Sequence, residues 1–177
     1  THTMASSAIR TEEEKKEYID DAETLDLKVT QLVEWIREAN HMTCFTGAGI
    51  STSTGIPDYR SGYGTILETG PGCWEKAAFK QKYKDDLIKK GKPLPDCHRL
   101  PFNITIQQAR PSLTHMAMVE LYNKGFLKYV ISQNIDGLHR RSGIPAEKMS
   151  ELHGNTNLEV CMKCKREHMR DFRTANA

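Results

Sequence analysis

The sequence predicts an α/β fold built on a parallel sheet. Two short β-prone runs, residues 42–46 and 127–132, are separated by segments with helical periodicity. The glycine-rich stretch 47–55 directly follows the first run, and a strand that enters such a turn is how nucleotide-binding α/β units begin. Together these features indicate a Rossmann-like sheet with helices on both faces. The 177 residues suffice for one ordinary domain and a small appendage.

Composition excludes several other classes. Lys and Arg number 25 against 23 for Asp and Glu, and a net charge of +2 does not indicate direct nucleic-acid binding. No apolar run is long enough for a membrane span, so no membrane partner is expected. Five unevenly spaced cysteines without a secretory signal favour a reducing compartment, nucleus or cytoplasm, over a disulfide scaffold.

The N-terminal third begins with residues 1–10, which look like an expression scar and a disordered start and do not enter the fold prediction. Thr11 and Glu14 fit a capping box, so a first helix is expected to begin there. Apolar residues between 25 and 36 recur at three- and four-residue steps. This stripe predicts a helix that packs against the core.

The middle of the chain interrupts the α/β pattern. Residues 72–108 contain a lysine-rich stretch, 74–90, that predicts a helix, and they are interpreted as an insertion or a lid. Order returns at Ser112, a plausible N-cap for a helix over 113–124 that stops at Gly125. The second strand follows, which predicts a parallel βαβ arrangement.

The first chemical candidate is the loop after the first strand. Glycines there let backbone amides approach a diphosphate, and the start of a helix would add a favourable dipole. Thr52 occupies the third glycine position of G-x-G-x-x-G, so spacing alone leaves a plain tight turn equally open. The block 55–60 (Gly-Ile-Pro-Asp-Tyr-Arg) adds a carboxylate, a ring and a guanidinium, which suit the ribose and amide ends of a dinucleotide.

Further polar residues follow the second strand. Gln133, Asn134 and Asp136 lie where an open parallel sheet binds ligands, but taken alone such residues favour turn formation and capping. His153 lies in a polar loop, and an imidazole that titrates near neutral pH can accept a proton from a hydroxyl group.

Cys161-x-x-Cys164 provides half of a tetrahedral zinc site. His168 would add a third ligand, and Cys73 or Cys97 a distant fourth. A pair of free thiols is the alternative interpretation.

In this order, these blocks resemble the sirtuins, the NAD-dependent protein lysine deacylases. The resemblance covers residues of about 27–172 except 72–108, and the residues at 111–115 and 150–155 are most similar to the nuclear, chromatin-associated subgroup. Tyr59 stands where the family commonly has Phe, and Ile66 where that subgroup usually has Trp. The blocks that carry the resemblance are Thr46–Ser51, Gly55–Arg60, Gln133–His139, His153-Gly154 and Cys161-x-x-Cys164.

The resemblance implies a role for each matching residue. His153 would be the general base, and Asn134 and Asp136 would complete the catalytic set. Cys161 and Cys164 would be the first pair of a four-cysteine structural zinc site. The implied NAD-binding residues are Gly47, Ala48, Gly49, Ser51 and Thr52 at the diphosphate, Ile56 and Asp58 at the carboxamide, Tyr59 and Arg60 in the cofactor loop, and Gln133, Asn134, Asp136 and His153 around the nicotinamide ribose.

The implied reaction is deacylation of lysine in a protein substrate, with histones as candidates, to give nicotinamide, free lysine and O-acyl-ADP-ribose. Two alternatives stay open: a mono-ADP-ribosyltransferase, and a catalytically silent NAD-binding or scaffold fragment. A nicotinamide-dependent dehydrogenase is disfavoured because the third glycine is absent and because Glu68, the acidic residue at about the right spacing for the ribose, falls in a glycine-rich loop and not at a strand end.

The resemblance also implies the domain organisation. Residues 11–157 would form the N-terminal part of the NAD-binding domain, and 158–177 the first half of a zinc-binding module. The family's second cysteine pair and later strands have no counterpart in these 177 residues. We therefore expect an incomplete sheet whose exposed edge promotes a dimer or a swapped assembly.

Overall fold

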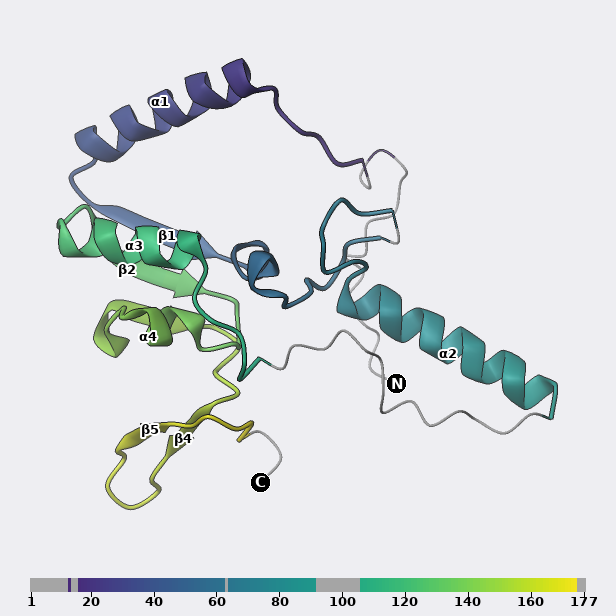
Figure 1. The fold of residues 1–177 in the computed structure, drawn as a ribbon. Coiled ribbons are helices and arrows are strands. Elements are labelled where there is room, and N and C mark those ends of the chain that lie inside the picture. The colour runs from purple at the N-terminus through teal and green to yellow at the C-terminus, as the bar shows by residue number, and fades with distance from the viewer. Residues whose placement is uncertain (1–12, 14–15, 63, 92–105, 175–177) are drawn as a thin grey trace. The chain divides into compact units, whose positions relative to one another are not determined.

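The computed structural model describes residues 13, 16–62, 64–91 and 106–174 (Figure 1). Two compact units divide the chain. One contains residues 1–19 and 57–103, and the other contains residues 20–56 and 104–177. The second unit holds the sheet and is called the sheet unit here.

A parallel three-stranded sheet forms the centre of the sheet unit. Its strands are β1 (Met42–Thr46), β2 (Leu127–Ser132) and β3 (Met149–Glu151), in the order β1-β2-β3. Cys44 lies beside Val130, and Thr46 beside Ser132. Both predicted strands are confirmed with their predicted bounds, and so is the predicted fold class, a Rossmann-like parallel sheet with helices.

Helices α3 (Leu113–Asn123) and α4 (Leu138–Ser142) connect the strands. The predicted N-cap is confirmed, because the Ser112 side chain accepts a hydrogen bond from the His115 amide. The His115 ring accepts in return from the Ser112 amide, which completes a capping box with a histidine in the usual place of Glu or Gln. The chain turns at Gly125, whose φ of 77° lies in the left-handed region that glycine adopts easily.

The core lies between α3 and one face of the sheet. Met118 of α3 packs with Leu127 and Val130 of β2, and with Ile144 and Met149 near β3. Burying a side chain of this size contributes roughly 1.5–3 kcal/mol. Leu127 and Val130 are three residues apart, and both reach this cluster because the β1–β2 register shifts between Met42 and Thr43. Phe45 of β1 is 61% exposed.

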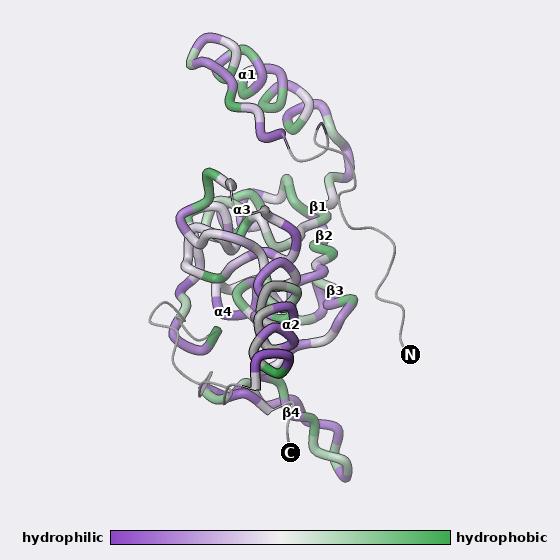
Figure 2. The backbone as a smooth tube through the Cα atoms, turned by 90° about the vertical axis from the view of Figure 1, so that its right-hand side faces the viewer, coloured by the Kyte–Doolittle hydropathy of each residue, from purple (hydrophilic) through white to green (hydrophobic). Residues whose placement is uncertain are grey.

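Helix α1 (Ala22–Glu38) begins later than the sequence predicts. Asp21 caps it by accepting from the Thr24 amide, 2.7 Å away, whereas the predicted capping residue Thr11 lies outside the described residues. The predicted packing of its apolar stripe is wrong for the described structure, in which α1 buries no residue. In Figure 2, hydrophobic stretches (green) and hydrophilic stretches (purple) alternate along α1. A local cap and helical hydrogen bonds define this helix, and the stripe remains without a covering partner among the described residues.

Strands β4 (Leu158–Val160) and β5 (Glu167–Met169) form an antiparallel hairpin in the sheet unit. Its turn carries Cys161 and Cys164. Lys165 has a φ of 59°, and its amide donates to the Cys161 carbonyl over 2.8 Å. The turn therefore folds back tightly and holds the two cysteines on one short segment.

The other unit contains helix α2 (Cys73–Lys89), which agrees with the helix predicted over 74–90. The amides of Gly72, Cys73 and Trp74 donate to the carbonyls of Ser61, Asp58 and Tyr59, over 2.8–3.0 Å. These bonds fasten the start of α2 to the 58–61 turn. The proline-rich stretch from Pro93 to Pro101 lies outside the described residues.

Candidate functional site

The glycine-rich loop after β1 contains two short 3-10 turns, Ala48–Ile50 and Thr52–Thr54. The expected start of an α-helix is wrong here. Gly55 has a φ of 89°, and the residue before Pro57 is disfavoured in helical conformation, so the chain cannot continue as a helix. The loop is instead a pair of tight turns.

Open space surrounds the two loop glycines. A Cβ atom added at Gly47 or Gly49 would meet nothing within 4 Å. Their φ angles do not demand glycine, and without side chains the backbone of the loop is left open to an approaching group. Thr52 fixes the loop from within, because its hydroxyl donates to the Gly49 carbonyl over 2.9 Å. The loop therefore fits a group that approaches the backbone closely, such as a diphosphate.

Two buried polar residues after β2 hold this loop. Asn134 donates from Nδ2 to the Gly47 carbonyl over 3.0 Å, and Ser51 donates from Oγ to Oδ2 of Asp136 over 2.7 Å. Ser51, Asn134 and Asp136 are 1%, 6% and 5% exposed. The structure thus brings together residues that lie far apart in the sequence, at the carboxyl ends of β1 and β2.

His153 is exposed and is tied to the same end of the sheet. Its Nδ1 atom lies 2.9 Å from the Gln133 carbonyl oxygen. A carbonyl oxygen can only accept, so Nδ1 carries a proton, and in the neutral form of the ring the lone pair is on Nε2. This tautomer is the one that a general base needs. The adjacent Gln133 is exposed, and its amide extends the sheet by donating to the Thr46 carbonyl over 3.0 Å.

The remaining candidates divide between the two units. Ala48 and Ile56 are half-buried in the sheet unit, whereas Asp58, Tyr59 and Arg60 belong to the other unit. The Asp58 carboxylate accepts from the amide and hydroxyl of Ser61 and so closes a local turn. Trp74 packs against the Tyr59 ring at a centroid distance of 5.7 Å and lies under the Arg60 guanidinium at 5.4 Å. These contacts give the 58–60 block a defined local shape.

The cysteine pair on the β4–β5 hairpin suits metal binding in its own turn. Backbone amides of Cys164 and Lys163 donate to the Cys161 sulfur and lower the pKa of its thiol, which favours the thiolate. The expected contribution of His168 is not supported, because no three His, Cys, Asp or Glu side chains cluster for a metal among the described residues. Cys73 belongs to the other unit, and Cys97 lies outside the described residues. Among the described residues, Cys161 and Cys164 are thus a pair on one turn without a third such side chain beside them.

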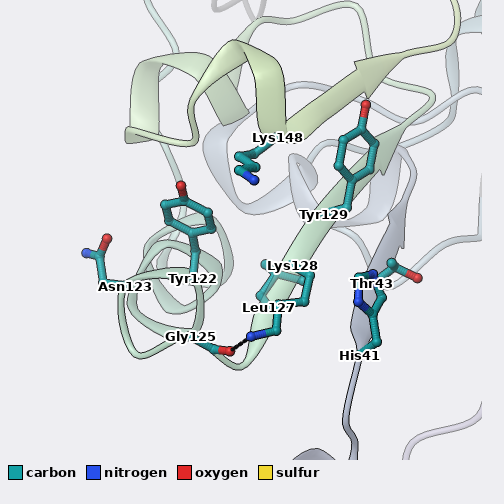
Figure 3. Close-up of a pocket in the computed structure, with 9 residues that line it drawn as sticks. All are labelled: His41, Thr43, Tyr122, Asn123, Gly125, Leu127, Lys128, Tyr129 and Lys148. Carbon is teal, nitrogen blue, oxygen red and sulfur yellow. Dashed lines mark hydrogen bonds between the residues drawn. The ribbon is translucent and has the colours of Figure 1, made fainter.

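A pocket of about 730 Å³ lies at the amino ends of β1 and β2, the opposite end from the loop of 47–55 (Figure 3). His41 lines it from just before β1 and Thr43 from β1 itself. Tyr129 lines it from β2, and Lys148 from the turn before β3. None of the predicted site residues lines this pocket, so it is separate from the candidate site.

Sequence reasoning missed three residues that support the site. The His115 and His139 rings are buried and hydrogen-bonded to Ser112 and Thr46, which flank the loop in the folded chain. Arg140 donates to Glu151 over 2.8 Å and to Glu167 over 2.6 Å, which connects the segment before His153 with β5. The capping position of His115 could be predicted from Ser112, whereas no local pattern indicates the other contacts.

The fold is that of the Rossmann-like class, a parallel sheet with polar residues gathered at the carboxyl ends of its strands. The Sir2 family matches residues 47–176, and the chain belongs to that family. It is 47% identical over 157 residues to the NAD-dependent protein deacetylase SRT1 of Arabidopsis thaliana, a match that covers 88% of this chain and 28% of that protein. The NAD-dependent protein deacetylase Sirt6 of Drosophila melanogaster is 43% identical over 152 residues, with 85% and 40% covered.

Solved structures show the same likeness. A complex of Sir2 with a p53 peptide and NAD+ matches with a TM-score of 0.50 and 30% identity, over 80% of this chain and 52% of that one. A complex of a Sir2 variant with deacetylated p53 peptide and 3'-O-acetyl ADP ribose matches with a TM-score of 0.51 and 29% identity, over 80% and 53%. The chain thus spans about half of these structures and less than half of the two curated relatives. No helix among the described residues is long and apolar enough to cross a membrane.

Proposed function

We propose that this chain supplies the NAD-binding and general-base residues of an NAD-dependent protein lysine deacylase. The observation that carries the proposal is the meeting of the open glycine loop, buried Asn134 and Asp136, and the His153 ring at one end of the sheet. Membership of the Sir2 family supports the choice of NAD and of an acyl-lysine protein as substrates.

NAD would supply a ribose carbon from which nicotinamide leaves as a neutral ring when the acyl oxygen of the modified lysine attacks. The amides of residues 47–52 would hold the diphosphate, and Asn134 and Asp136 would orient the nicotinamide ribose. His153 would accept a proton from a ribose hydroxyl at Nε2, while the Gln133 carbonyl holds the Nδ1 proton in place. The hydroxyl oxygen would bond to the acyl carbon, the bond from that carbon to the lysine nitrogen would break, and a water molecule would complete O-acyl-ADP-ribose as free lysine leaves.

The remaining roles belong to the same proposal. Ile56 and Asp58 would face the carboxamide, Gln133 would contact the ribose, and Tyr59 and Arg60 would belong to the cofactor loop. Residues 11–157 would be part of the NAD-binding domain, with 72–108 as an insertion or lid, and 158–177 would begin the zinc module.

The test is a mass-spectrometric assay of the purified chain with NAD and an acetyl-lysine peptide. We expect O-acetyl-ADP-ribose as the product, and a loss of at least about a hundredfold in rate in His153→Ala with NAD binding retained. His41→Ala is the matched control, because that imidazole lies at the other end of the sheet. Near-normal turnover in His153→Ala would remove the assigned base.

Two other products would change the proposal. ADP-ribose attached to a protein acceptor would indicate a mono-ADP-ribosyltransferase. NAD binding without nicotinamide release would indicate that this chain is a silent NAD-binding or scaffold fragment.

We also propose that Cys161 and Cys164 bind structural zinc together with a second pair of thiolates. The lowered pKa of the Cys161 thiol supports this role, since zinc takes cysteine as thiolate. Two ligands hold zinc weakly, so the zinc content of a monomer should be well below one per chain by elemental analysis. Stoichiometric, tightly bound zinc in a monomer would contradict the half site.

Partners and location complete the proposal. We infer an acyl-lysine protein as the substrate, with histones as candidates. The resemblance to the nuclear subgroup favours the nucleus over the cytoplasm as the location. Imaging of a fluorescent fusion tests the location. The outer strands β1 and β3 and the exposed Phe45 favour association of two copies, which scattering with size-exclusion chromatography tests: a monodisperse monomer at high concentration would argue against it.

A further inference from the structure

Two buried imidazole rings lie beneath the glycine-rich loop. His115 of α3 is 0% exposed and His139 of α4 is 2% exposed, and their ring centroids are 4.8 Å apart. Histidine is seldom buried this completely, and a buried polar ring is costly unless its nitrogens are bonded. Their hydrogen bonds therefore indicate what the pair does.

Each ring fixes one end of the loop. His139 Nε2 lies 2.9 Å from Oγ1 of Thr46, the residue directly before Gly47. The Ser112 hydroxyl lies 2.8 Å from His115 Nδ1 and 2.9 Å from the Ile50 carbonyl oxygen, and its single proton is shared between these two acceptors. The loop from Gly47 to Ile50 is thus held at its start through one ring and at its end through the other.

These bonds require a neutral His115. Its Nδ1 accepts from the Ser112 amide over 3.2 Å, so the ring proton is on Nε2. A proton added at Nδ1 would place two donors face to face and break the capping box. Nε2 of His115 and Nδ1 of His139 are buried without a partner among the described residues, so neither offers a place for a stabilised charge.

The charged groups that face the pair are Asp136 and Arg141. Burial lowers the pKa of both rings, and that of His139 to about 4. The Asp136 carboxylate raises the pKa of both rings. Arg141 lowers the pKa of His115, and the His115 ring lowers that of His139. The surroundings on balance keep both rings neutral around pH 7.

We propose that His115 and His139 are positioning residues that, as neutral rings, set the geometry of the 47–50 loop for a diphosphate. The ligand in this statement rests on the proposed function, whereas the effect on the loop does not.

The first measurement is made on the isotope-labelled chain by NMR. At pH 7.5 the nitrogen shifts of the His115 ring should identify the tautomer with the proton on Nε2. A proton on Nδ1 would overturn the proposal, and this result needs no variant.

The second measurement is amide hydrogen exchange of Ser51 and Gly55, whose amides close the loop turns over 2.9 and 3.0 Å. His115→Leu and His139→Leu should speed exchange at these amides by roughly five- to tenfold relative to the amide of Val130, the effect of one lost hydrogen bond. His115→Asn and His139→Gln, which replace Nδ1 and Nε2 respectively, should restore most of the protection. His41→Leu, outside this cluster, should have no effect.

Three results would overturn the proposal: unchanged loop exchange in the Leu variants, equal acceleration throughout the sheet, or no rescue by Asn and Gln. Because exchange is measured without NAD, failure of the proposed function would appear separately, as absence of NAD binding with the loop effects intact. If NAD binds, its dissociation constant should rise in the same order as loop exchange.

Discussion

The Ser51–Asp136 contact offers the sharpest test of how the site is built. Oδ2 of Asp136 accepts from the Ser51 hydroxyl over 2.7 Å, and Oδ1 accepts from the Leu138 amide over 2.9 Å. Asp136→Ala would leave both donors without this acceptor in a site that is nearly inaccessible to water. Hydrogen bonds to a charged group contribute about 1.5–3 kcal/mol each, so the free energy of unfolding should fall by roughly 3–5 kcal/mol.

Two milder variants separate the two bonds. Ser51→Ala removes one donor, and Asp136→Asn keeps a single acceptor oxygen for two donors, so each should cost about 1.5–3 kcal/mol. The double variant Ser51→Ala/Asp136→Ala should cost about 1–2 kcal/mol less than the sum of the single changes, because the shared bond can be lost only once.

Urea denaturation followed by circular dichroism at pH 7.5 measures all four chains. Ser53→Ala is the matched control, since Ser53 is an exposed serine in the same loop and its loss should stay within about 0.5 kcal/mol. If Asp136→Ala behaved like Ser53→Ala, or if the two changes were additive, the carboxylate would not be what holds the loop.

Three further perturbations test other parts of the structure. Burial lowers the pKa of His139 from 6.5 to about 4 in the folded chain, so its contribution to stability is present above about pH 6.5 and is lost as the pH falls toward and through 4. His139→Gln should flatten the slope of the unfolding free energy against pH, measured by urea titrations. An unchanged slope would exclude His139 as its source. Gly72→Ala would bring a Cβ to 2.5 Å from the Arg60 amide nitrogen, so the nearby Tyr59–Trp74 contact should open. The opening should change Trp74 fluorescence, measured in a Trp35→Phe background. Identical spectra would count against this tight approach. Arg140→Leu would remove the cation paired with the Glu151 carboxylate, whose side chain is 7% exposed and whose pKa is raised by burial. The free energy of unfolding by urea should fall by roughly 3–5 kcal/mol, with partial rescue by Arg140→Lys. A cost below about 1 kcal/mol would contradict the bridging role.

Local signals explain why much of the sheet unit could be predicted. β1 and β2 follow from short β-prone runs, and α3 follows from a serine cap and a terminal glycine. The polar residues after β2 could be placed at the ligand-binding edge because parallel strands share that edge. Their mutual contacts, such as Asn134 with Gly47, depend on register between distant strands and were not predictable.

Other features failed for identifiable reasons. An apolar stripe shows that a helix is amphipathic but does not show what covers it, and α1 buries nothing in the described structure. The signals that end the turn after β1, Gly55 and Pro57, were present in the sequence, but the glycine pattern suggested a helix more strongly. The buried imidazole pair is set by packing between α3 and α4, which no periodicity encodes.

The pairing of Thr46 with Ser132 has a consequence for how the chain acquires its structure over time. β1 leaves the ribosome early, but its neighbour in the sheet emerges only after the whole of residues 57–103 has been made. The closing contact is therefore long-range, and such contacts slow folding. Replacing 57–103 by a short linker would roughly halve the loop and lower its closure cost by about 0.6 kcal/mol, a gain of about threefold in rate if the strands pair in the transition state. The loop that follows β1 is held by Asn134 and Asp136 from beyond β2, so it can take its final shape only after this late closure.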